Sequence, residues 1–188
     1  NSPANPTGSV LTFDDIKGIA DLAKDHDLRV LSDEVYWKVI FGEKHHSIAS
    51  LDGMFERTIT VNGLSKTYAM TGWRLGWAIA PLEYIKGLNT LQTHSLTCVT
   101  SFVQKAGVEA LKGPQDSVEM MVDEFRARKD LIMSLIRDIP SLHCPEPKGA
   151  FYLLPSYDHK MSSEDMAAYL LDKAHVAVTP GAAFGPSG

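Results

Sequence analysis

The chain has 188 residues, of which 44% are hydrophobic and 22% are charged, with a formal net charge of −5 and a pI near 5.8. Such a chain can bury the core of one domain, or of one domain and part of a second. The acidic balance speaks against a nucleic-acid surface, and no apolar run reaches the roughly 20 residues that a membrane span needs.

The first residues and the cysteines suggest the setting of the chain. The run Asn-Ser-Pro-Ala-Asn-Pro-Thr-Gly is rich in turn residues and lacks an initial methionine, so we expect an internal piece of a longer protein. Cys98 and Cys144 lie in apolar surroundings without a CxxC spacing. Free buried thiols in a reducing, cytoplasmic compartment are the expected state.

Helix and strand signals alternate from the start of the chain. Thr12 followed by Asp15 predicts a capping box, and the helix that it opens continues to about residue 27 with an apolar face. Residues 29–32 predict a buried strand that ends at Asp33. The members of the apolar helix face are Ile16, Ile19, Ala20 and Ala23.

Two more strands follow in the first part of the chain. The β-branched run 58–61 predicts a buried strand, and residues 75–80 predict a third, followed by a helix that begins at Pro81. This alternation favours an α/β fold with a mostly parallel sheet and flanking helices. A further helix over 101–111 is ended by Gly113 and Pro114.

The second part of the chain begins with a long helical pattern. Apolar residues recur at helical spacing from Val118 to Ile139, and about 25 residues at 1.5 Å each make a rod of about 38 Å that could connect two domains. Beyond Pro140 the sequence predicts a smaller α+β unit. It comprises strands at 142–144, 149–154 and 176–179 and a helix at 163–174.

Lys66 stands where a ligand site is expected. The predicted strand 58–61 is broken by Asn62 and Gly63 just before this lysine, which places it at a carboxyl end of the sheet. In open parallel sheets that edge binds ligands. The competing interpretation is an ordinary solvated surface lysine.

Motifs spread over nearly the whole chain are similar to those of one family. NPTG at 5–8, DEVY at 33–36, SK at 65–66 and GWRLG at 72–76 resemble the fold-type I, pyridoxal-phosphate-dependent aminotransferases of class I/II, the aspartate and aromatic aminotransferase group. GAFY at 149–152 and the run from Pro180-Gly181 to Phe184-Gly185 resemble the small-domain motifs of the same enzymes.

The resemblance implies catalytic roles for three residues. Lys66 corresponds to the lysine that forms the Schiff base with pyridoxal 5'-phosphate and moves the substrate proton, for which it must lose its charge near neutral pH. Asp33 corresponds to the carboxylate that keeps a proton on the pyridine nitrogen. The alternative for Asp33 is a cap for a short helix over 34–38, and Glu34 is the rival carboxylate. Tyr36 corresponds to a donor to the phenolate oxygen of the cofactor, with a plain core aromatic as its alternative.

Other residues correspond to further cofactor contacts. Asn5 matches a second donor to the phenolate oxygen, although NPTG by itself is merely a turn. Arg74 matches the guanidinium that grips the phosphate, with a surface salt bridge as its alternative, and its flanking residues favour partial burial. Ser65 adds a hydroxyl for the phosphate. Many relatives place another serine where this chain has Gly63, which puts one phosphate contact in doubt.

Other site types lack support in the sequence. His26, His45 and His46 lack metal-ligand spacing, so we expect solvated loop histidines and no metal. Neither a GxGxxG nor a P-loop pattern occurs, which removes the usual case for a dinucleotide or a nucleoside triphosphate.

The resemblance also implies a domain plan and an activity. Residues 1–113 are expected to be the C-terminal part of the cofactor-binding large domain, and residues 114–188 the connecting helix and an incomplete small domain. The full-length parent is expected to be a homodimer that transfers an amino group from aspartate or an aromatic amino acid to 2-oxoglutarate, with no nucleic acid or membrane partner. We expect little or no activity from the fragment alone.

Three alternatives stay open. Another fold-type I enzyme, such as a carbon–sulfur lyase or a synthase that eliminates a γ-substituent, would share Lys66, Asp33 and Arg74. A non-catalytic fragment would contribute only an interface or a folding unit. An unrelated parallel α/β binding domain is disfavoured by the ordered motifs.

Overall fold

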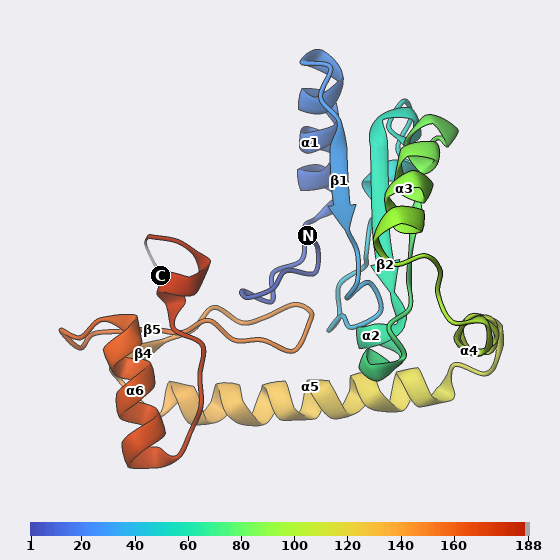
Figure 1. The fold of residues 1–188 in the computed structure, drawn as a ribbon. Coiled ribbons are helices and arrows are strands. Elements are labelled where there is room, and N and C mark those ends of the chain that lie inside the picture. Colours follow the sequence, from blue (N-terminus) through green and yellow to red (C-terminus); the bar gives the residue numbers. More distant parts are fainter. Residues whose placement is uncertain (187–188) are drawn as a thin grey trace.

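The computed structural model describes residues 1–186, and Figure 1 shows a small sheet with helices around it above one long helix. The elements of the first part are α1 (Phe13–Asp25), β1 (Val30–Asp33), β2 (Thr58–Gly63), α2 (Leu64–Thr67), β3 (Gly76–Ile79), α3 (Leu82–Ser95) and α4 (Ser101–Lys112). The later part contains α5 (Asp116–Arg137), β4 (Leu142–His143), β5 (Ser156–Tyr157) and α6 (Ser163–Ala174). Short 3₁₀ helices lie at η1 (Ile48–Ser50), η2 (Phe55–Arg57), η3 (Thr71–Trp73) and η4 (Gly181–Phe184).

Helix α1 has the predicted start and most of the predicted buried face. The Thr12 hydroxyl accepts from the Asp15 backbone N–H, and the Asp15 carboxylate accepts from the Thr12 backbone N–H, which confirms the capping box. Three of the predicted face residues are buried, whereas Ile19 is exposed. The buried three form a core cluster with η1 and the loop before η2: Ile16, Ala20, Ala23, Ile48 and Met54.

The sheet is mixed, so the prediction of a mostly parallel sheet is wrong for its third strand. β1 pairs in parallel with β2, with Val30 opposite Thr58 and Asp33 opposite Val61, but β2 pairs antiparallel with β3. The segment between β2 and β3 contains only α2 and η3. This link contains no long crossover helix, and the chain turns back alongside β2. In Figure 1, α1 and α3 lie on opposite sides of the sheet.

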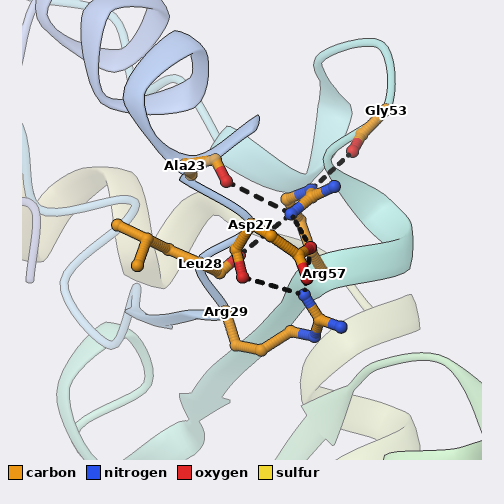
Figure 2. Close-up of polar contacts among 6 residues, drawn as sticks. All are labelled: Ala23, Asp27, Leu28, Arg29, Gly53 and Arg57. Carbon is orange, nitrogen blue, oxygen red and sulfur yellow. Dashed lines mark hydrogen bonds and ion pairs between the residues drawn. The ribbon is translucent and has the colours of Figure 1, made fainter. Parts of the chain in front are cut away.

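An arginine ties the end of α1 to the segment before β2. Figure 2 shows the Arg57 guanidinium between the carbonyl oxygens of Ala23, Leu28 and Gly53, to which it donates at 3.2, 3.1 and 3.3 Å. It also donates to the Asp27 carboxylate at 3.1 Å. The carbonyls at a helix end lack partners within the helix, so this side chain serves as a cap.

The long helix is confirmed, with α5 spanning 22 residues. Figure 1 shows it running beneath the sheet, with β4, β5 and α6 at its far end. The predicted helix at 163–174 is also confirmed, and β4 and β5 form a two-stranded antiparallel sheet.

Two predicted strands of the later part are wrong. Residues 149–154 form a turn and irregular chain with one isolated bridge, Ile40 to Gly149, because Ala150 adopts a left-handed conformation (φ 57°) that interrupts an extended run. Residues 176–179 are irregular, and no strand within residues 1–186 pairs with them. A lone strand leaves its backbone groups without partners.

Two further sequence predictions, on membrane spans and on the cysteines, can be compared with the structure. Across residues 1–186, no helix combines the length and the apolar character that crossing a membrane requires. Both cysteines are free, as predicted, but Cys98 is exposed and only Cys144 is partly buried. The expectation of buried thiols is therefore wrong for Cys98.

Candidate active site

Lys66 and Asp33 lie at the same edge of the sheet. Asp33 is the last residue of β1, and Lys66 belongs to α2, which follows β2 directly. Because β1 and β2 are parallel neighbours, their carboxyl ends meet at one edge, and Figure 1 shows both strands running toward α5. Lys66 is partly buried, and its ammonium makes no hydrogen bond or ion pair within residues 1–186. The prediction that Lys66 stands at a strand's carboxyl end is confirmed.

Two aromatic rings lie on one side of the Lys66 ammonium. Its Nζ atom lies 5.8 Å from the ring centre of Tyr36 and 5.5 Å from that of Phe151. Tyr36 comes from the turn after β1, and Phe151 from the segment that follows Gly149. These ring faces attract a cation while they displace water from one side of the amine.

Asp33 and Glu34 have different surroundings. The Asp33 Oδ1 atom accepts from the Val35 backbone N–H at 3.0 Å, and Oδ2 has no partner among the described residues. This bond caps the turn that follows, and that turn replaces the short helix expected over 34–38.

Glu34 is buried in its own set of hydrogen bonds. Its carboxylate accepts from Ser47 Oγ at 2.7 Å and from Ser32 Oγ at 3.1 Å, and it pairs with His45 Nε2 at 2.9 Å. Burial opposes ionisation, but the bonds from His45 and Ser47 outweigh it and hold the pKa of Glu34 below its ordinary value. Glu34 is therefore engaged, whereas Asp33 keeps a free oxygen.

The expectation of solvated loop histidines is wrong for His45. Its side chain is only 13% exposed, because its Nε2 atom pairs with buried Glu34, and its Nδ1 atom is buried without a partner in the described chain. Residues 1–186 contain no cluster of three potential metal ligands.

Tyr36 is a buried phenol paired with a second phenol. Its hydroxyl lies 2.5 Å from that of Tyr152, and the two rings meet edge to face at 5.6 Å. Burial raises the pKa of Tyr36 well above its ordinary value, and the hydrogen bond with Tyr152 adds to the rise. A buried tyrosine hydroxyl usually has a hydrogen-bond partner, so this pairing fits both a core role and a site role for Tyr36.

Sequence reasoning assigned no role to Phe151 or Tyr152, although both approach Lys66 or Tyr36. The sequence did contain a signal for a role of these two residues, because both belong to the GAFY motif. The contacts themselves join residues 116 positions apart, which no local pattern reveals.

The NPTG loop lies against this cluster. The Ser2 backbone N–H donates to the Asp33 carbonyl at 3.2 Å, and the Gly8 carbonyl accepts from the backbone N–H groups of Lys148 and Gly149. Asn5 itself is exposed, and its side chain makes no hydrogen bond within residues 1–186. The structure thus brings the loop to the site without showing a contact for the Asn5 amide.

Arg74 and Ser65, the two expected phosphate ligands, make few side-chain hydrogen bonds in the described part of the chain. Arg74 is exposed, in a left-handed conformation at the end of η3, and its Nη1 atom donates to the Thr71 carbonyl at 2.9 Å. The expected partial burial of Arg74 is wrong, because η3 ends in a surface turn that carries the side chain outward. A groove of about 720 Å³ is lined by Arg74 and by residues of α4. Ser65 is partly buried and makes no side-chain hydrogen bond in the described part of the chain.

Comparison with known proteins identifies the family. Residues 1–188 match the family model for class I and II aminotransferases. An aspartate aminotransferase of Pyrococcus abyssi is 48% identical over 192 residues, covering 100% of this chain and 49% of the relative. The aromatic-amino-acid aminotransferase 2 of Thermococcus litoralis is 46% identical, with the same coverage.

A solved structure agrees with this match. The aromatic aminotransferase from Pyrococcus horikoshii OT3 superposes with a TM-score of 0.97 at 48% identity, covering 100% of this chain and 51% of that one. This chain therefore spans about half the length of the relatives that it matches. Since both the sequence match and the backbone match extend over the whole chain, it belongs to the class I and II aminotransferases, a pyridoxal-phosphate-dependent family.

Proposed function

We propose that the parent protein transfers an amino group from an amino acid to a 2-oxo acid at the site around Lys66. Aspartate or an aromatic amino acid is the proposed donor, in keeping with the names of the two relatives, and 2-oxoglutarate is the proposed acceptor. The observation that carries the proposal is the Lys66 amine, which lies beside two aromatic rings that pack against each other and makes no hydrogen bond or ion pair in the described chain.

The residues at this edge fit pyridoxal 5'-phosphate. When bound, that cofactor supplies an aldehyde for an amine and an electron-withdrawing ring. Within residues 1–186, Lys66 offers a primary amine with no competing partner, Asp33 offers a carboxylate oxygen with no other bond, and Tyr36 offers a buried hydroxyl. These groups match the reactive aldehyde, the ring nitrogen and the ring oxygen of the cofactor.

The residues have separate proposed tasks. Lys66 Nζ holds the cofactor covalently and later takes up the proton from the α-carbon of the substrate. Asp33 keeps a proton on the ring nitrogen, because a partly buried anion stabilises the adjacent positive charge. Tyr36 and Asn5 donate to the ring oxygen, and Ser65 and Arg74 are the proposed ligands of the phosphate.

The broader setting is part of the proposal. Residues 1–113 are proposed to belong to the large, cofactor-binding domain and residues 114–188 to a connecting helix and a small domain. A cytoplasmic homodimer is the proposed form of the parent.

Other pyridoxal-phosphate chemistries that share Lys66, Asp33 and Arg74, such as elimination, predict keto-acid release without an acceptor. An assay with and without 2-oxoglutarate separates the two reactions.

Borohydride trapping tests the role of Lys66, and it suits a chain that spans about half the length of its relatives. The chain is mixed with pyridoxal phosphate, reduced, digested and mapped by mass spectrometry. We expect the cofactor on Lys66 and a visible absorbance band before reduction.

The matched control is Lys38, another partly buried lysine whose ammonium lies over aromatic rings but donates to Gln115 at 2.8 Å. Lys66→Ala should remove both the band and the label, and Lys38→Ala should leave both in place. Label spread over several lysines in the unmodified chain would contradict the proposal.

A further inference from the structure

The hydroxyl groups of Tyr36 and Tyr152 form a pair beside Lys66. Their oxygens are 2.5 Å apart, and the Phe151 ring packs edge-on against Tyr36 at 5.4 Å. The charged groups that face Tyr36 are the Lys66 ammonium, 5.8 Å from its ring centre, and the Asp33 carboxylate, which acts on its hydroxyl through space. Tyr36 thus lies between the proposed cofactor residues and a second phenol.

Backbone contacts fix where Tyr152 stands. The Lys148 and Gly149 N–H groups donate to the Gly8 carbonyl at 2.8 and 2.9 Å, and the Ala150 N–H donates to the Val39 carbonyl at 2.8 Å. A Cβ atom on Gly149 would lie 2.8 Å from the Pro3 side chain, so the Gly149 backbone packs closely against that ring. Tyr152 therefore follows directly on a segment that is anchored to Gly8 and to Val39, and its hydroxyl meets Tyr36.

The number of hydroxyl hydrogens decides the direction of this hydrogen bond. A tyrosine hydroxyl donates one hydrogen and accepts through its oxygen lone pairs. If Tyr36 gave its hydrogen to Tyr152, it would have none left for the ring oxygen of the cofactor. If Tyr152 donates instead, the Tyr36 oxygen is satisfied as an acceptor and its own hydrogen is available.

We propose that Tyr152 is a positioning residue that donates its hydroxyl hydrogen to Tyr36 and thereby directs the Tyr36 hydrogen toward the cofactor's ring oxygen. This inference rests on the proposed function. Two hydrogen bonds in series polarise each other, so the donation from Tyr152 strengthens the one that Tyr36 makes. The negative charge on the ring oxygen is then better stabilised than Tyr36 alone would achieve.

The test is the pH midpoint of the visible absorbance change of bound pyridoxal phosphate. Tyr152→Phe keeps the ring and removes one donor. The negative charge on the ring oxygen is then less stabilised, so the deprotonated form is reached only at higher pH. The midpoint should move upward by about half to one pH unit. Tyr36→Phe should move it upward further, because the direct donor is lost. In the double variant, Tyr152→Phe should add nothing, since its partner is already absent.

Tyr157→Phe is the control. The Tyr157 hydroxyl donates to the Met161 carbonyl at 3.1 Å, and we expect no shift when it is removed. Thermal unfolding of every variant measures any loss of stability separately, so that a shift of the midpoint can be compared with it.

Each outcome has one meaning. An unmoved midpoint in Tyr152→Phe, or shifts that add in the double variant, would overturn the positioning role while the visible band keeps the proposed function standing. A chain without any such band, and without trapping at Lys66, overturns the proposed function itself. A shift that disappears in the double variant supports the donation from Tyr152.

Discussion

At the residue scale, two adjacent carboxylates show how burial and partners divide tasks. Asp33 and Glu34 are neighbours in the chain, but successive residues of extended chain point in opposite directions. The Glu34 carboxylate enters the interior and is satisfied by His45, Ser47 and Ser32. Asp33 keeps one oxygen free at the sheet edge. The free carboxylate suits a ligand, and the satisfied one suits a structural role.

The pH dependence of stability tests the structural role of Glu34. Because folding lowers the pKa of Glu34, its ionised form adds stability above the pH at which the unfolded carboxyl ionises. That contribution is lost as the pH falls through the folded pKa. Glu34→Gln should therefore cost about 1–3 kcal/mol at pH 7, measured by urea unfolding, and the deficit should shrink in acid.

Glu43 gives a matched comparison, because its carboxylate pairs with Lys148 at 3.1 Å on the exposed surface. Glu43→Gln should change stability by less than about 0.5 kcal/mol at pH 7. A Glu34→Gln deficit of equal size at neutral and acidic pH would show that its charge is not the cause.

At the element scale, Arg57 holds the end of α1 against the segment that leads into β2. Its guanidinium spans three carbonyl oxygens and one carboxylate, as Figure 2 shows. The planar guanidinium of arginine carries several donors and can satisfy several acceptors at once, whereas the lysine ammonium is a compact charge on a flexible stem. The helix end and the start of the sheet are thereby joined by one side chain.

Arg57→Lys should destabilise the chain by about 1–2 kcal/mol, because the charge stays but the fork is lost. Thermal unfolding measures the loss, and amide exchange should quicken at Leu28. Arg29→Lys is the comparison, because Arg29 also pairs with Asp27 but donates to one carbonyl, that of Asp27, against three for Arg57, and is 54% exposed, against 20% for Arg57. If both variants lose the same stability, the carbonyl contacts are not the source of the effect.

At the scale of the whole molecule, Gln115 connects the start of α5 to the candidate site. Its Oε1 atom accepts from Lys38 Nζ at 2.8 Å and from the Tyr68 hydroxyl at 3.2 Å. Its Nε2 atom donates to the carbonyls of Ala110 and Gly113. Lys38 lies two positions after Tyr36, and Tyr68 two positions after Lys66. One amide therefore links the site to the proposed domain boundary.

Gln115→Ala should loosen the start of α5 because four hydrogen bonds lose their shared partner. We expect hydrogen exchange at Val118 and Glu119 to rise by about tenfold, as a loss of about 1.4 kcal/mol in local opening energy would produce. Gln104→Ala is the comparison, because the Gln104 amide donates only to the nearby Val99 carbonyl. Unchanged exchange at the start of α5 would mean that other contacts hold the junction.

The sequence alone determined the features that depend on near neighbours in the chain. The capping box at Thr12 and Asp15, the helix at 163–174 and the placement of Lys66 after β2 are all set within a few residues. Motif resemblance identified the family, because each motif is contiguous in the sequence. Helix propensity, capping and hydrophobic periodicity act over the same short range.

Only the tertiary structure decided what depends on distant partners. The antiparallel direction of β3 appears only in its pairing with β2, and the exposure of Arg74 follows from the turn that ends η3. The burial of His45 requires Glu34, and the position of Tyr152 requires Tyr36, 116 residues away. Contacts of this kind form only when the chain closes large loops, and that closure leaves no pattern in neighbouring residues.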